Sequence, residues 1–317
     1  MVIDIHDVWQ NARLQHETYV NTHVHQALAG EYARGPATKV LLDFQFFLDV
    51  CLNDIISSDN TDFENVITSF QAIFPVGGAT EKEADALARR VFNYDAFRAA
   101  TANAAWDTYR LCLLARYKIC PYCHIHSTET VTKNGALKGY RGDLDHYLAR
   151  THYPYLALSL GNLIVSCELC NGSKMKHQKD FRRVPHLHPL KDSSGIQFKL
   201  RPAGGAAWTP TLRAFRERMD NYEIEVTASN GSVQALNSLK TFQLSPRYQP
   251  HLNDAYRVAK VGRNPGWVNS LLKVTGIALS IKDQLGFTPA TDEYKHVPVG
   301  KMRRDVYLAS RTQAGDG

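Results

Sequence analysis

The chain has 317 residues, of which 44% are hydrophobic and 21% charged, and its formal net charge at neutral pH is +6. These values are ordinary for a globular protein with one large or two to three modest domains. A helical membrane protein is excluded as a class, because no run of about 18 apolar residues is present. The first residues lack the basic and apolar regions of a secretion signal, which predicts a cytoplasmic protein.

Residues 1 to about 105 have the apolar periodicity of helices. Segment 37–56 is apolar almost all round, which predicts a helix that is buried or faces a partner. Segment 94–118 places aromatic residues at helical intervals and leads directly into a pair of cysteines. Cys51 and Cys112 lie within these apolar patterns, so we expect both to be buried core thiols.

After about residue 185 the pattern changes. Segments 195–202 and 222–228 are predicted as short strands, and the loop between them contains a helical stretch, 210–220. The sequence therefore predicts an α+β fold that is mainly helical and carries a small central module. The predicted regions are a helical N-terminal region (1–105), a central module (106–190) and a mixed, mainly helical C-terminal region (191–317).

The positive charge of the chain is concentrated around the cysteines. Residues 115–183 contain 11 Lys and Arg but five Asp and Glu, which leaves 26 basic and 26 acidic residues in the rest of the chain. All of the net positive charge therefore falls on this segment, which favours a polyanionic ligand there. A solvated basic face is the alternative.

Two Cys-x-x-Cys pairs, "CPYC" and "CELC", have the spacing of a structural zinc site with four thiolates. The predicted ligands are Cys120, Cys123, Cys167 and Cys170. The 43 residues between the pairs exceed the roughly 15–20 of a simple zinc ribbon, so the insert has room for a functional element. His124 and His126 could substitute as ligands, but four thiolates suffice. The alternative is four buried cysteines without a metal.

The insert contains "GDLDHYL" and "GNLIV", which predict a strand, a loop and a second strand, and we expect a helix to begin near Asn171. Together with "CPYC" and "SCELCNGSK", this order resembles the zinc-ribbon HNH endonucleases of the His-Me finger (ββα-metal) superfamily. The resemblance covers roughly residues 120–179 and implies a zinc-stabilised ββα-metal (HNH) module in the centre of the chain.

The resemblance also implies a role for each residue of the motif. His146 would be the general base that takes a proton from the attacking water, since an imidazole titrates near neutral pH. Asp145 and Asn171 would hold one catalytic Mg²⁺ or Mn²⁺ through oxygen atoms. Asn162 would tie the loop to the hairpin and orient the histidine.

Several charged and polar residues surround this motif. By proximity, the predicted phosphate contacts are Arg141, Arg150, Lys174 and Lys176. We interpret Asp143 as a turn or surface acid rather than a second metal ligand. His152 and His177 are expected to be exposed loop and helix residues, with His177 able to touch a phosphate.

The function that the resemblance implies is metal-dependent hydrolysis of phosphodiester bonds in DNA, with double-stranded DNA as the expected substrate. HNH proteins with large flanking regions are often nuclease subunits of phage-defence or mobile-element systems, sometimes beside an ATPase. The alternatives are an RNA-directed nuclease and a non-catalytic zinc module that binds nucleic acid or a partner protein. The complete Asp-His, Asn, Asn series favours an enzyme, because a binding module does not require an Asp-His pair at this spacing.

Overall fold

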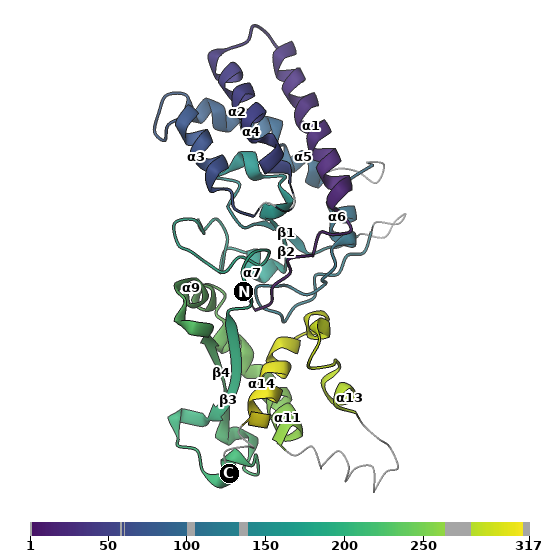
Figure 1. Cartoon of the computed structure of the whole chain (residues 1–317), viewed down its shortest axis with the longest axis vertical. Coiled ribbons are helices and arrows are strands. Elements are labelled where there is room, and N and C mark those ends of the chain that lie inside the picture. The colour runs from purple at the N-terminus through teal and green to yellow at the C-terminus, as the bar shows by residue number, and fades with distance from the viewer. Residues whose placement is uncertain are drawn as a thin grey trace.

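The computed structural model describes residues 2–57, 59, 61–99, 105–132, 139–263 and 280–312. The chain is elongated, with a helical bundle at one end, a β-hairpin in the middle, and a second β-hairpin packed on helices at the other end (Figure 1). The first part contains α1 (Arg13–Ala33), α2 (Lys39–Ile56), α3 (Glu64–Ile73), α4 (Glu81–Val91), α5 (Tyr94–Ala99) and α6 (Thr108–Leu114). The middle contains β1 (Asp143–His146), β2 (Leu163–Ser166) and α7 (Glu168–Asn171). The last part contains β3 (Ile196–Pro202), α8 (Pro210–Arg213), β4 (Tyr222–Ala228), α9 (Val233–Thr241), α10 (Leu244–Tyr248), α11 (Leu252–Arg263), α13 (Ile281–Leu285) and α14 (Gly300–Thr312).

These elements confirm the predicted fold class, a mainly helical chain with small antiparallel sheets. Both strands predicted after residue 185 form: β3 pairs with β4 from Ile196 opposite Ala228 to Pro202 opposite Tyr222. The residues of β3 are alternately buried and exposed, as expected for a sheet with one face on a core. The predicted helix 210–220 is wrong beyond α8. Phe215 adopts a left-handed backbone conformation with φ of 50°. A right-handed helix cannot continue through such a residue, so α8 does not extend to residue 220.

Helix α2 explains why segment 37–56 is apolar almost all round. One face packs into the core through Phe44 and Phe47, which are fully buried. The opposite face exposes Leu42, Phe46 and Val50, whose exposed fractions are 53%, 60% and 58%. These three residues follow one another at intervals of four, so they form one stripe along the helix.

The N-terminal segment holds the central hairpin in place. The indole Nε1 of Trp9 donates a hydrogen bond of 3.1 Å to the backbone carbonyl of Leu163 at the start of β2. The Nε2 of His16 lies 2.7 Å from the carbonyl oxygen of Leu158, in the loop between β1 and β2. All four residues of β2 are buried, as expected for a strand covered on both faces.

The three predicted regions are in contact, and their buried apolar residues form one continuous cluster. Among the described residues, Val2 donates its backbone N–H to Pro121, and the Tyr248 hydroxyl donates to the backbone carbonyl of Cys123 at 2.6 Å. The region boundaries near residues 105 and 190 remain predictions. No helix in the described part of the chain combines the length and apolar character needed to cross a bilayer.

Candidate functional site

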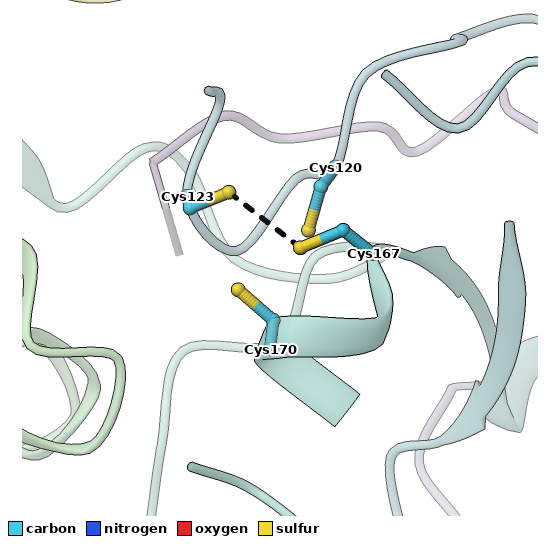
Figure 2. A group of neighbouring side chains, drawn as sticks. All are labelled: Cys120, Cys123, Cys167 and Cys170. Atoms are coloured by element: carbon cyan, nitrogen blue, oxygen red, sulfur yellow. Dashed lines mark hydrogen bonds between the residues drawn. The ribbon is translucent and has the colours of Figure 1, made fainter. Parts of the chain in front are cut away.

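The four cysteines of the two pairs lie together with their sulfur atoms directed at a common centre (Figure 2). All four are buried and free of disulfides, and their sulfur atoms lie within 4.8 Å of one another. The Sγ atoms of Cys123 and Cys167 are 4.0 Å apart. A tetrahedral zinc ion with Zn–S bonds of about 2.3 Å needs sulfurs about 3.8 Å apart. The donor set therefore fits one structural Zn²⁺.

The histidines that follow the first pair are directed elsewhere. The chain turns tightly after Cys120, where the backbone N–H of His124 donates to the Cys120 carbonyl at 2.7 Å. The His124 ring contacts the C-terminal region instead, with Nδ1 accepting from the backbone N–H of Lys301 at 3.2 Å. In the part of the chain that the structure describes, neither His124 nor His126 belongs to the cysteine cluster.

One positive side chain lies beside the thiolates. The Nη1 atom of Arg247 is 3.3 Å from the Sγ of Cys170. Four thiolates around Zn²⁺ carry a net charge of −2, so a nearby guanidinium reduces the cost of burying that charge. Sequence analysis missed Arg247, because it lies 77 positions from Cys170 and no local pattern connects the two.

A cavity of about 350 Å³ opens beside β1 and α7, close to the cysteine cluster. The lining residues include five that the sequence predicts for the site: Arg141, Asp145, His146, Arg150 and Asn171. Asp143 and His177 also line it. Sequence analysis missed Tyr94 and Arg98, which α5 contributes from the N-terminal helical region.

The geometry around His146 defines the protonation state of its ring. Its Nε2 lies 2.9 Å from the backbone carbonyl of Ala157, which can only accept a hydrogen bond. Nε2 therefore carries the proton, and Nδ1 is the unprotonated nitrogen of the neutral ring. Burial lowers the pKa of His146 to about 4, although the bond to the Ala157 carbonyl acts in the opposite direction. The ring is therefore neutral at pH 7, and Tyr94 packs edge-on against it at 4.5 Å between ring centroids.

Asn162 fixes the loop that supplies the Ala157 carbonyl. Its Oδ1 accepts from the backbone N–H of Leu148 at 2.7 Å, and its Nδ2 donates to the carbonyls of Leu148 and Leu156 at 3.0 and 3.1 Å. All three bonds are buried, so the amide joins the two ends of the loop between β1 and β2. Asn162 thus holds the backbone next to Ala157, whose carbonyl contacts His146.

Asp145 and Asn171 are the residues predicted to bind a hard cation through oxygen atoms. Asp145 is only 3% exposed, and its two carboxylate oxygens accept hydrogen bonds from the Tyr122 hydroxyl at 2.6 Å and from Lys176 Nζ at 2.8 Å. The Nδ2 of Asn171 donates to Asp143 at 3.2 Å, which leaves its Oδ1 as an acceptor. Two protein oxygens suit Mg²⁺ or Mn²⁺, because such ions usually keep several waters and add substrate phosphate oxygens.

The predicted helix beginning near Asn171 is wrong, because α7 ends there. Gly172 is extended, and the chain then turns back, so that the backbone N–H of Lys176 donates to the Cys170 carbonyl at 3.1 Å. His177 adopts a left-handed conformation with φ of 47°, and it lies in a turn rather than in the predicted helix. This reversal brings the Lys176 ammonium to Asp145. A continuous helix would instead carry Lys176 away from the hairpin.

Lys176 does not occupy the surface position that a phosphate contact requires. Its side chain is fully buried and is bound to Asp145, so the prediction of Lys176 as a phosphate contact is wrong. Arg141 and Arg150 line the cavity, and Lys174 is exposed. Arg150 is also paired with Asp95 of α5 at 2.9 Å.

The concentration of positive charge is weaker in space than along the sequence. Acids from the N-terminal region lie against several of the central bases, in the pairs Arg116–Asp7, Arg150–Asp95 and Arg182–Glu64. The cavity nevertheless keeps three arginines, since Arg98 and Arg141 line it together with Arg150. Two of these three, Arg98 and Arg150, are paired with Asp95 of α5.

Comparison with known proteins gives one informative match. The chain is distantly similar to Septu protein PtuB of Bacillus thuringiensis. The two are 24% identical over 149 residues, which cover 38% of this chain and 57% of PtuB. The match thus spans little more than half of PtuB. No protein-family model matches the chain, and no solved structure matches it.

Metal analysis tests the cysteine centre. We expect about one zinc per chain, and we expect the double substitution Cys120→Ser with Cys167→Ser to remove it. Zinc binding by such sites contributes on the order of 10 kcal/mol to folding, so the double variant should lose structure in the hairpin. Cys51→Ser is the matched control, because Cys51 is buried but lies outside the cluster. Retention of the zinc by the double variant would contradict the assignment.

Proposed function

We propose that the chain is a metal-dependent HNH endonuclease that hydrolyses phosphodiester bonds of DNA. The observation that carries this proposal is the state of His146, a neutral ring with an unprotonated Nδ1, which lines a cavity together with Asp145, Asn171 and three arginines. The ring is unprotonated at neutral pH and so can accept a proton, but burial lowers its pKa below the near-neutral value expected from the sequence, which makes it a weaker base than a free imidazole.

Each group would have a distinct task in the reaction. Nδ1 of His146 would take the proton from the attacking water, while the Ala157 carbonyl and Asn162 keep the ring in one orientation. Arg98 and Arg141 would bind phosphate oxygens of the strand that enters the cavity. A divalent cation held by Asp145 and Asn171 would stabilise the charge on the phosphate and on the leaving 3′ oxygen.

A non-catalytic zinc module is the second candidate, since the cysteine centre alone could serve a binding role. The buried hydrogen bonds of His146 and Asn162 favour the enzyme. The side chains of His146 and Asn162 are both buried, one bound to the Ala157 carbonyl and the other to the neighbouring Leu156 carbonyl, and a zinc module with only a binding role does not need this arrangement. Cleavage of RNA by the same groups is the alternative within the enzyme class.

The similarity to the Septu protein PtuB supports a function in phage defence for this chain. HNH proteins with large flanking regions often work in such systems, so we propose a companion ATPase as partner. This part of the proposal rests on similarity and not on the cavity.

Substitutions of the neighbouring β1 residues Asp145 and His146 should impair cleavage in different ways. His146→Ala removes the proton acceptor but leaves the metal ligands, so cleavage of supercoiled plasmid should fall roughly 10²–10⁴-fold while binding of Mn²⁺ persists. Asp145→Ala removes the only charged ligand, so Mn²⁺ should bind weakly and activity should partly return at high Mn²⁺ concentration. Both variants should keep their zinc. Full activity of pure His146→Ala protein would exclude the HNH mechanism.

Binding to duplex DNA should weaken steeply with salt and depend little on sequence. With no divalent ion added, removal of a phosphate contact should reduce the slope of log K against log salt by about 0.9. We expect this for Arg98→Gln and for Lys174→Gln. Arg218→Gln is the control, since Arg218 is an exposed arginine of the C-terminal region. A flat salt dependence of the unmodified protein would favour a protein partner over DNA.

A further inference from the structure

Lys176 is a fully buried lysine in contact with both residues of the Asp-His pair. Its Nζ lies 2.8 Å from Oδ1 of Asp145 and 2.5 Å from the backbone carbonyl of His146. Lysine is almost never fully buried without a partner, because removal of its charge from water is costly. The ion pair with Asp145, the proposed metal ligand, therefore accounts for the burial of Lys176.

The charge balance of the cavity follows from this pair. Asp145 and Lys176 neutralise each other, and Asn171 carries no charge. Asp143 is the other acid that lines the cavity, against the arginines Arg98, Arg141 and Arg150. Even with Arg150 balanced by Asp95 outside the lining, the cavity has no net negative charge to attract a divalent cation. A phosphodiester brings both the negative charge and the further oxygen ligands that such a cation needs.

We propose that Lys176 is a positioning residue that holds the Asp145 carboxylate and keeps the affinity of the cavity for a divalent cation low until a phosphodiester is bound. This inference rests on the proposed function, since it concerns the same site. The Tyr122 hydroxyl fixes the second oxygen of Asp145, so the carboxylate is oriented before any ligand arrives. The cation and the nucleic acid then bind cooperatively, and each raises the affinity for the other by the same factor.

Direct measurement of Mn²⁺ binding tests this inference without reference to activity. The zinc-loaded protein with His146→Ala is used throughout, so that the DNA is not cut, and bound Mn²⁺ is counted by electron paramagnetic resonance with and without a short DNA duplex. We expect weak binding of Mn²⁺ alone, and binding tighter by roughly tenfold or more with the duplex. Equal affinity in both cases would overturn the inference.

The second arm changes the charge itself. Lys176→Met keeps an apolar stem of similar length and removes the positive charge beside Asp145, so Mn²⁺ should bind roughly tenfold more tightly without DNA. The effect of the duplex should shrink accordingly. Lys179→Met is the matched control, because Lys179 is an exposed lysine three residues further along the chain, and it should leave Mn²⁺ affinity without DNA unchanged. An unchanged affinity in folded, zinc-containing Lys176→Met protein would assign Lys176 a purely structural role and contradict the proposal.

Failure of the inference can be separated from failure of the proposed function. If Asp145→Asn leaves Mn²⁺ binding unaltered with and without the duplex, the proposed metal site itself is wrong. If Asp145→Asn abolishes Mn²⁺ binding, but the duplex does not change the Mn²⁺ affinity of the protein with intact Asp145, only the inference about Lys176 is wrong. Should Lys176→Met fail to fold, as judged by circular dichroism and zinc content, the comparison with and without the duplex still decides.

Discussion

The convergence of the two cysteine pairs is the constraint on which the rest of the site depends. It closes the 43-residue insert at its base, where β2 ends at Ser166 beside Cys167 and β1 begins at Asp143 opposite Ser166. The same point contacts the two flanking regions, through Val2 at Pro121 and through Tyr248 at Cys123. A metal bound there would therefore stabilise the hairpin and its position against the helices together.

From this anchor the structure builds a histidine in a defined chemical state. The loop between β1 and β2 is held at both ends by the amide of Asn162, and it presents the Ala157 carbonyl to the imidazole. The hydrogen bond determines which nitrogen carries the proton, and burial keeps the ring neutral. The flanking helices then complete the cavity, since Tyr94 and Arg98 come from α5.

Sequence patterns predict the parts of this site that depend on short-range spacing. The cysteine pairs and the strands β3 and β4 were predicted from residue types and intervals alone, and the structure confirms their arrangement. The roles of His146 and Asn162 came from resemblance and remain predictions, although their hydrogen bonds are those that such roles require. The exposed residues Leu42, Phe46 and Val50 of α2 show what composition does not predict. An apolar sequence does not distinguish a helix buried on all sides from one with an exposed apolar face.

The features that sequence analysis missed depend on contacts between distant segments. Arg247 reaches the cysteines and α5 reaches the cavity only because separate regions pack together. Lys176 was predicted as a phosphate contact because it is basic and close to the motif. Its burial follows from the reversal of the chain after α7, and the backbone bonds that hold this reversal have no simple signature in residue types.

The chemical ends of the reaction products test the central claim most directly. Pure protein should nick supercoiled plasmid in the presence of Mg²⁺ or Mn²⁺, and the nicks should be sealed by DNA ligase, which requires a 5′ phosphate beside a 3′ hydroxyl. The proposed mechanism predicts this result, because water would attack the phosphate and the 3′ oxygen would leave. The absence of nicking, or nicks with 5′ hydroxyl ends that ligase cannot seal, would contradict the account.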